Sequence, residues 1–515
     1  MEIFGHAFCT VHGETAFVPG EEAFLRQSNR WPLLTVARIV NADTETPVSA
    51  YLKLGGGSHS FLLESAEGGE RWGRYSFIGY NPMDVVLYRN GRVEHPIRGE
   101  TVEGVDPVSY LFQRLERFRT PPVLPGVPFS GGAVGYFGYD LLPFMDRFHL
   151  REKPGLDLPE MCFVFTRDSA VFDHLLGRLI LMRHVPIPPR ATEGEVRSLY
   201  REAASHLEEM AEKVRSPLRA RLLDAYYFSP RIDGETLDSN LSREEFEEAV
   251  NRAKEYIYQG EIFQAVISQR FRLPLKASPF SIYRALRSEN PSPYMFFLKM
   301  EDVILVGSSP EPMVRQRGGE ALIRPIAGTR RRGRDPEEDR LLEEELTRDE
   351  KERAEHVMLV DLARNDLGRV CLPGSVRVTK EMYVEKYSHV MHLVSEVSGK
   401  LRPGKGNLDL LRATFPAGTV SGAPKIRACE IIDELEPERR GPYAGAVGYL
   451  SYTGDMDTCI TIRTVIISGR TAYVQAGAGV VADSVPAREY EETLNKARAL
   501  LRAIKKAESM EGVFL

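Results

Sequence analysis

Two Glu-x-x-Glu pairs lie on two segments with helical patterning. Glu352 and Glu355 continue into leucines at spacings of four and three residues, and Glu489 and Glu492 lie in the last amphipathic segment. Residues three or four positions apart share one face of a helix, so each pair presents two carboxylates to one side. Carboxylate oxygens suit Mg²⁺, which keeps open positions for water and substrate oxygens. Each pair alone is a weak signal, because glutamates on a helix usually face solvent.

A cation and a glycine pair lie between these segments. Arg463 falls in a β-patterned run at 458–467, and Gly477-Ala478-Gly479 follows the next such run. A planar guanidinium suits bidentate binding of a carboxylate, although an edge position with the charge in water is the simpler interpretation. Glycines at a bend let a ligand oxygen reach backbone N–H groups. Together these features predict a pocket for a small molecule with two carboxylates, one bound by the protein and one by a metal.

The elements that must position these residues are predicted from periodicity and capping signals. A capping box at 347–350 starts a helix that should end near Asp366. Three strands at 446–452, 458–467 and 471–476 are expected to form a meander before the last helix. Arg463 would then sit in the middle of the central strand.

The whole chain is longer than one ordinary core supports, so two sub-domains or one composite domain are expected. The N-terminal region, 1–190, is patterned as strands and turns. A junction at 191–240 holds a charged amphipathic helix at 193–215. A capping box at 242–245 opens the second region, 241–508, which carries the candidate site.

Composition excludes several classes of protein. The net charge is −6, with 43% hydrophobic and 27% charged residues, as in a soluble globular protein. Arg330–Arg332 precedes an acidic run at 337–345, which argues against nucleic-acid binding. No long apolar run and no basic-then-apolar N-terminal segment occurs, so we expect neither a membrane span nor secretion. The five scattered cysteines, including Cys9, fit a reducing cytoplasm.

Several ordered motifs match a known family. They are Pro325–Arg330, Ala354–His356 with Asp361–Leu367, Tyr387–His392, Phe415–Lys425, Asp457–Arg463, Gln475–Gly479 and Glu492–Ala497. Through them the sequence resembles the chorismate-utilising enzymes, and within these the anthranilate-forming branch. The resemblance is dense from 242 to 503 and looser before 190. It implies an α+β fold of antiparallel sheets packed as a sandwich, with helices on the outside.

The resemblance also implies roles for individual residues. Mg²⁺ would bind Glu355 and Glu492, with Glu352 and Glu489 nearby through water, and would hold the ring carboxylate of chorismate. The other residues implied to bind chorismate are Gly328, Thr329, Tyr449, Arg463, Gly477, Ala478, Gly479 and Lys496.

The implied catalytic residues are Glu311, His392 and Thr329. Glu311 would be the general acid for the departing 4-hydroxyl, and His392 would serve the proton transfers of pyruvate loss. Without the resemblance, a surface glutamate and a core histidine would be the simpler interpretations.

Two positions bear on the reaction. Relatives that add water at ring carbon 2 place a lysine base where this chain has Gln264. Relatives that make 4-amino-4-deoxychorismate place a lysine nucleophile where it has Ala327. The resemblance therefore implies attack by ammonia at carbon 2 and elimination of pyruvate to give anthranilate, the first step of tryptophan biosynthesis. The alternatives are a related aminating enzyme that makes 2-amino-2-deoxyisochorismate or 4-amino-4-deoxychorismate, and an inactive ligand-binding regulatory subunit.

A partner and a regulator are implied as well. No cysteine lies in a Gly-x-Cys-x-Gly turn, so ammonia would come from a separate glutaminase subunit, in a hetero-oligomer of two large and two small subunits. Two segments resemble a site for feedback inhibition by tryptophan, although each alone could be an ordinary buried strand. The residues implied are Glu64, Ser65, Asn290, Pro293, Tyr294, Met295 and Phe296.

Overall fold

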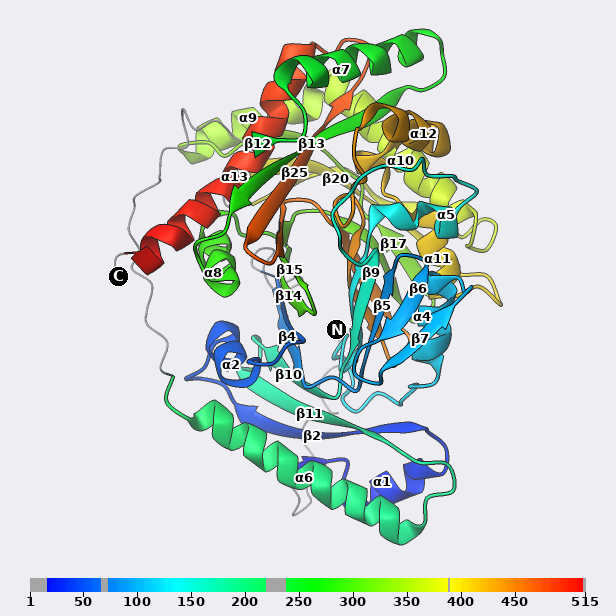
Figure 1. Cartoon of the computed structure of the whole chain (residues 1–515), viewed down its shortest axis with the longest axis vertical. Coiled ribbons are helices and arrows are strands. Elements are labelled where there is room, and N and C mark those ends of the chain that lie inside the picture. The colour runs from blue at the N-terminus through cyan, green and yellow to red at the C-terminus, as the bar shows by residue number, and fades with distance from the viewer. Residues whose placement is uncertain (1–15, 66–72, 219–237, 388–389, 513–515) are drawn as a thin grey trace.

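A computed structural model describes residues 16–65, 73–218, 238–387 and 390–512 (Figure 1). Cys9, part of the junction at 219–237, and Ser388 and His389 of the Tyr387–His392 motif lie outside the described residues. Within the described ranges the strands form two antiparallel sheets, sheet A with thirteen strands and sheet B with twelve.

Sheet A contains strands from both sequence regions. In spatial order they are β1 (Phe17–Val18), β2 (Leu33–Asn41), β11 (Arg178–Pro186), β10 (Asp168–Asp173), β4 (Tyr75–Tyr80), β3 (Ser60–Glu64), β14 (Tyr294–Met300), β15 (Val303–Ser309), β24 (Thr464–Ser468), β25 (Thr471–Val480), β13 (Gln264–Pro274) and β12 (Asp238–Ser239), with β21 (Gly422–Ala423) paired to β13. The two regions meet where β3 pairs with β14.

Sheet B is shared in the same way. Its order is β18 (Ile326–Arg331), β20 (Val390–Lys400), β17 (Glu320–Ile323), β16 (Pro312–Arg317), β23 (Met456–Ile460), β22 (Ala446–Ser451), β8 (Gly132–Phe137), β9 (Met161–Phe165), β5 (Asp84–Arg89), β6 (Arg92–His95) and β7 (Glu100–Glu103), with β19 (Arg377–Lys386) paired to β20. Here the regions meet where β8 pairs with β22. Neither sheet is therefore built by one region alone.

The sheets pack face to face, and helices cover their outer faces (Figure 1). Phe61 of sheet A and Tyr136 of sheet B belong to the core between the sheets. Sheet A is covered by α1 (Glu21–Ser28), α2 (Pro47–Leu54), α6 (Glu193–Arg215), α8 (Pro279–Glu289) and α13 (Pro486–Gly512). Sheet B is covered by α4 (Pro107–Glu116), α5 (Leu142–Met145), α10 (Glu350–Gly368) and α11 (Asn407–Thr414). The α+β sandwich with outer helices is confirmed.

The remaining helices lie near the candidate site. α7 (Arg243–Tyr258) and α12 (Lys425–Leu435) pack with β13, α9 (Pro336–Arg348) packs against β18, and a 3-10 turn, η2, spans Gly418–Val420. No helix in the described part of the chain combines the length and apolar character needed to cross a membrane.

Local capping signals were mostly reliable. Ser242 and Glu245 form the expected capping box of α7, and α6 has the predicted bounds. The capping box at 347–350 is wrong, because Thr347 lies inside α9. Asp349 caps α10 instead, and its side chain accepts hydrogen bonds from the amides of Lys351 and Glu352. The acidic helix is present, but it is capped by Asp349 and begins at Glu350, slightly later than the predicted capping box implies.

The predicted meander is wrong. β22 pairs with β23 in sheet B, whereas β24 pairs with β25 in sheet A. The chain passes from one sheet to the other between Ile460 and Thr464, and Arg463 lies in this crossover with φ 48°. Apolar residues continue through the run because both strands are buried, so the pattern does not reveal the change of sheet.

The predicted glycine bend is also wrong. Gly477 and Gly479 lie in β25, extended and paired with β13. β24 pairs with β25 only up to Val474, so among the described strands β13 is the sole partner of the last part of β25. A Cβ on Gly477 would lie 2.8 Å from the Tyr443 hydroxyl oxygen, and one on Gly479 would lie 2.6 Å from Nε2 of Gln264. Close approach, not a bend, explains both glycines.

Candidate active site

A cavity of about 400 Å³ lies among β13, β18, β20, β25, α10 and α13, in the upper part of Figure 1. It brings together most residues singled out from the sequence. Those at its wall are Gln264, Glu311, Ala327, Gly328, Thr329, Glu355, His392, Arg463, Gly477, Gly479, Glu489, Glu492 and Lys496.

Glu311 supplies an acid to this cavity. It lies in the short link between β15 and β16, and Oγ1 of Thr419 donates a hydrogen bond to its Oε1 at 2.9 Å. Burial raises the pKa of Glu311 to about 8, although Thr419, Lys496 and Arg463 act in the opposite direction. The carboxyl is therefore mostly protonated at neutral pH and can donate a proton to a departing oxygen.

His392 and Thr329 face each other across two strands. They are register partners on β20 and β18, and Nδ1 of His392 lies 3.0 Å from Oγ1 of Thr329. The same nitrogen lies 3.3 Å from the carbonyl oxygen of Gly328. A carbonyl only accepts, so this contact favours the tautomer with its proton on Nδ1. Both side chains line the cavity, where an imidazole can exchange protons with a ligand.

Arg463 and Lys496 supply positive charge. Burial lowers the pKa of Arg463, and Glu311 in its ionised form opposes this. Nη1 of Arg463 lies 3.5 Å from Oδ1 of Asn290, and its carbonyl accepts a hydrogen bond from the Ser308 amide at 3.1 Å. A largely buried guanidinium is suited to a ligand carboxylate. Lys496 donates to the carbonyl of Gly477 at 2.9 Å.

Three carboxylates from two helices line the same cavity. Burial raises the pKa of Glu355, and the charges of Glu352 and Glu492 raise it further. Burial likewise raises the pKa of Glu489, with Glu492 adding to the effect. Lys496 pairs with Glu492 at 2.7 Å. The carboxylates of Glu355, Glu489 and Glu492 repel one another, and a bound cation would relieve that repulsion.

The donors fit Mg²⁺ by their chemistry, because all are hard carboxylate oxygens. In the described ranges, however, no three acidic, histidine or cysteine side chains already form a group that could hold an ion. Glu352 does not line the cavity and instead pairs with Arg330 at 3.1 Å. Glu355, Glu489 and Glu492 are thus the residues that would hold the metal.

Two residues expected to bind chorismate do not line this cavity. Ala478 is fully buried, because alternate residues of β25 point to opposite faces. Tyr449 lies on β22 between the sheets, with its ring centroid 4.5 Å from that of Phe129. Tyr443 lines the cavity in its place. It lies in the same glycine-rich stretch as Tyr449 but precedes the strand, a difference that the sequence pattern does not show.

Lys351 and Thr419 were also missed as cavity residues. Thr419 lies in a motif that matches the family, so the sequence could have indicated it as a residue of the site. Lys351 lies on the first turn of α10, four residues before Glu355, and helical spacing could have placed it on the same face.

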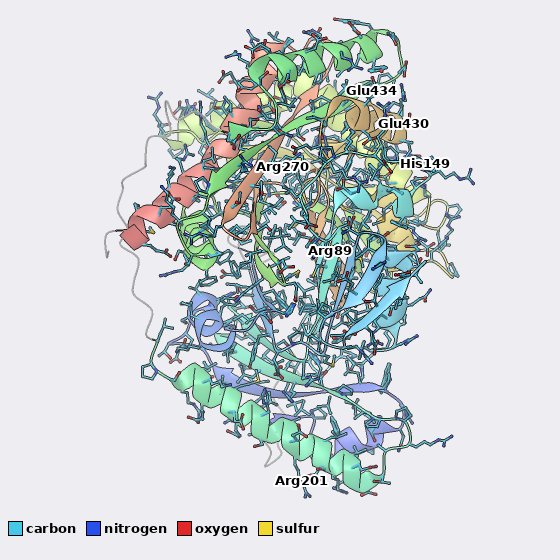
Figure 2. The ribbon with its side chains drawn as sticks, viewed as in Figure 1. Arg89, His149, Arg201, Arg270, Glu430 and Glu434 are labelled. Carbon is cyan, nitrogen blue, oxygen red and sulfur yellow. The ribbon has the colours of Figure 1, made fainter. Side chains whose placement is uncertain are left out.

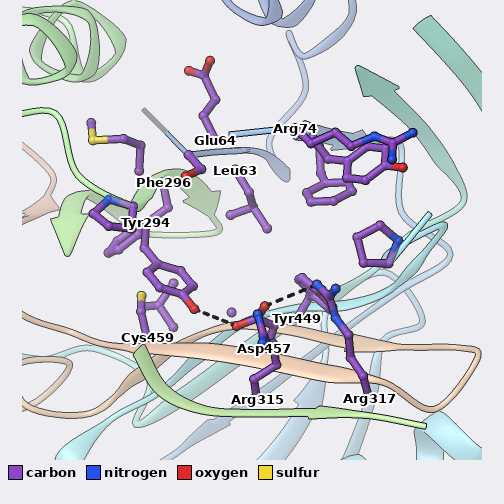
Figure 3. A pocket seen from close by; sticks show the side chains of 18 of the residues that line it. Leu63, Glu64, Arg74, Tyr294, Phe296, Arg315, Arg317, Tyr449, Asp457 and Cys459 are labelled. Atoms are coloured by element: carbon purple, nitrogen blue, oxygen red, sulfur yellow. Dashed lines mark hydrogen bonds and ion pairs between the residues drawn. The ribbon is translucent and has the colours of Figure 1, made fainter. Parts of the chain in front are cut away.

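A second cavity, of about 340 Å³, joins the two segments expected to bind tryptophan (Figure 3). β3 and β14 are neighbours, and Glu64 is the register partner of Met295. The expected residues at its wall are Glu64, Ser65, Pro293, Tyr294, Met295 and Phe296. The Tyr294 hydroxyl donates to Oδ1 of Asp457 across the cavity at 3.0 Å.

Asn290 does not line this second cavity. It is the C-cap of α8, and its side chain contacts Arg463 at the first cavity. The structure thus places Asn290 apart from the other residues expected to bind this ligand, because the chain turns between the helix end and β14.

Comparison with known proteins agrees with this architecture. The family model described as chorismate binding enzyme matches residues 58–502. The chain belongs to the chorismate binding enzyme family. It is 46% identical to anthranilate synthase component 1 of Acetivibrio thermocellus over 495 residues, 95% of this chain and 99% of the relative. It is 49% identical to the protein of the same name from Thermus thermophilus over 479 residues, 91% of this chain and 97% of the relative.

Two solved structures have the same fold. Anthranilate synthase component I from Streptococcus pneumoniae TIGR4 superposes with a TM-score of 0.72 at 37% identity, covering 90% of this chain and 99% of its own. The menaquinone-specific isochorismate synthase of Escherichia coli gives a TM-score of 0.66 at 19% identity, covering 94% of this chain and 98% of its own. At that identity the likeness concerns the fold alone.

Proposed function

We propose that this chain is the large subunit of an anthranilate synthase, converting chorismate and ammonia to anthranilate and pyruvate. The observation that carries the proposal is one cavity that holds Glu311 as a protonated acid together with His392 and Arg463. Gln264 and Ala327 line the same cavity, and neither can act as the lysine that the water-adding or 4-aminating reactions require. The named relatives point to the same reaction.

Each side chain at the cavity wall has a separate role in the proposed reaction. Arg463 binds the enolpyruvyl carboxylate, and the wall at Gly477 and Gly479 leaves room for it. As ammonia attacks carbon 2, Glu311 gives its proton to the departing 4-hydroxyl, which is otherwise a poor leaving group. His392 then serves the proton transfers of pyruvate loss. Glu355, Glu489 and Glu492 would hold Mg²⁺, which would offset the negative charge of the ring carboxylate.

One assay tests the reaction. The purified chain is mixed with chorismate, Mg²⁺ and an ammonium salt at mildly alkaline pH, and anthranilate is followed by its fluorescence. We expect anthranilate and pyruvate in equal amounts. A non-aromatic aminated product would support the related aminating enzymes, and chorismate binding without turnover would support a regulatory subunit. A parallel reaction with excess chelator should be inactive if Mg²⁺ is required.

The partner and the regulator belong to the same proposal. Ammonia comes from a separate glutaminase subunit, in a cytoplasmic assembly of two large and two small subunits. Tryptophan binds the second cavity, where Ser65 lies at the wall for its ammonium group and Met295 and Phe296 for the indole. The Glu64 carboxylate already accepts a hydrogen bond from the Tyr283 hydroxyl and pairs with Arg287. Its binding inhibits by favouring a less active arrangement of the chain.

A further inference from the structure

A buried ion pair lies directly behind the wall of the active-site cavity. Arg440 is 2% exposed and Glu436 is 4% exposed. Nε of Arg440 donates to Oε2 of Glu436 at 2.8 Å, and Nη2 donates to Oε1 at 2.6 Å. The pair is thus bidentate, which fixes the plane of the guanidinium. Neither side chain lines the cavity.

The Nη1 and Nη2 groups of Arg440 also donate hydrogen bonds to two separate backbone segments. Nη1 donates to the carbonyl of Val420 in η2, and Nη2 to the carbonyl of Val266 in β13, each at 2.7 Å. Both valines line the cavity. The guanidinium carbon also lies 5.5 Å from the ring centroid of Tyr443, a third wall residue. One side chain therefore contacts three separate parts of the wall.

Glu436 extends the contacts to β25. Its Oε1 accepts hydrogen bonds from the amide and the hydroxyl of Ser268, each at 2.8 Å. Gln475, at the cavity wall, donates to the Ser268 hydroxyl at 2.8 Å and accepts from Nε of Arg270 at 3.1 Å. Figure 2 shows Arg270 in the interior, with Glu434 farther out on α12. The side chain of Gln475 is thus held at both ends.

We propose that the Glu436–Arg440 pair is a positioning device for the substrate. A buried ion pair contributes little net stability compared with apolar residues of similar size, because both charges must be desolvated. What apolar residues cannot do is orient two carbonyls, a serine and an aromatic ring at once. The wall residues oriented in this way are Val266, Val420, Tyr443 and Gln475. The inference rests on the proposed function, since it names what aligns chorismate.

Arg440→Lys tests the inference while keeping the positive charge. A lysine ammonium is a compact point charge and cannot pair bidentately with Glu436 while also reaching both carbonyls. We expect the KM for chorismate to rise by about tenfold or more, with a smaller change in kcat, because ground-state alignment is lost. The matched control is Arg183→Lys, which changes a largely buried arginine paired with Asp168 at 2.8 Å, away from the cavity. Its KM should stay at the wild-type value.

A second variant separates positioning from folding. Glu436→Leu with Arg440→Met replaces the pair by apolar residues. It also removes the hydrogen bonds to the Val266 and Val420 carbonyls and to Ser268, so it should unfold below the wild-type temperature. It should still be folded at the assay temperature and retain the raised KM. A wild-type KM in this double variant or in Arg440→Lys would overturn the inference. Failure of both variants to fold would also overturn it, because the pair would then be a purely structural element. A wild-type chain that makes no anthranilate would instead refute the proposed function.

Discussion

At the residue scale, the site depends on a carboxyl group that stays protonated near neutral pH. Glu311 can donate a proton only while it is protonated, and this fraction falls as pH rises through about 8. With the concentration of free ammonia held constant, we expect kcat/KM for chorismate to fall above that pH. A rate that stays level to high pH would contradict Glu311 as the acid.

The raised pKa of Glu311 also predicts how the free energy of unfolding depends on pH. Because the folded pKa of Glu311 lies above its ordinary value of 4.5, the folded chain binds this proton more tightly than the unfolded chain. The contribution of Glu311 to the free energy of unfolding therefore falls as pH rises from about 4.5 to about 8. Glu311→Gln, which does not titrate, should weaken this pH dependence in urea unfolding and should also reduce anthranilate formation.

A substitution at His392 should separate amination from the later loss of pyruvate. Its Nδ1 contacts Thr329 and Gly328 at the cavity wall, so the ring is held at a fixed place beside a bound ligand. His392→Met keeps a side chain of similar size without an exchangeable proton. We expect amination to continue and anthranilate release to fall strongly, with an aminated, non-aromatic compound accumulating. Chromatography of the products checks this, and unchanged anthranilate formation would remove His392 from the mechanism.

At the element scale, β18 must bulge to present its side chains to the cavity. The register with β20 shifts between Ala327 and Thr329, and Gly328 in between has φ 60°. A Cβ at Gly328 would lie 2.8 Å from Cδ1 of Leu346 on α9. Glycine is therefore required both by the backbone conformation and by the approach of the helix.

Gly328→Ala tests this requirement. The left-handed conformation alone costs a non-glycine residue about 1–2 kcal/mol, and contact with Leu346 adds to that cost. We expect lower stability in urea unfolding together with a clear loss of activity, because the bulge positions Thr329 opposite His392. Gly99→Ala is the matched control, since Gly99 has φ 66° and no described atom lies within 4 Å of the place its new methyl group would take. Gly99→Ala should lose stability alone, and equal losses of activity in both variants would contradict this account.

At the scale of the whole molecule, the two sequence regions share both sheets. The second cavity lies between those sheets, with Ser65 beside β3 of the N-terminal region and Asp457 on β23 of the second region. β23 leads directly into the crossover that carries Arg463. A ligand in the second cavity would therefore contact segments that continue into the active site, which is the physical route expected for the proposed inhibition.

Ser65→Arg tests that route. An arginine would fill part of a cavity of about 340 Å³ and add a positive charge where the ammonium group of tryptophan is expected. We expect an enzyme that keeps its activity in excess tryptophan. Ser58→Arg, at an exposed position shortly before β3, is the control and should remain inhibited like the wild type. Normal inhibition of the Ser65 variant would refute this cavity as the regulatory site.

Local sequence was enough to predict most of the elements and the chemical groups of the site. Capping residues and helical spacing placed α6, α7 and the acidic faces of α10 and α13, because these signals depend on neighbours within a few residues along the chain. The family resemblance likewise indicated Glu311, His392 and Arg463 as candidates for one site. All of these follow from local sequence or from matching residue types.

The way distant segments meet could be seen only in the folded chain. It placed Arg463 in a crossover between sheets, and it put Tyr443 at the active-site cavity in place of Tyr449. In the folded chain Asn290 contacts Arg463 and does not line the second cavity. Burial of Glu311 raises its pKa to about 8. Burial and proximity between residues far apart in the chain arise only when the sheets pack, so no local pattern carries them.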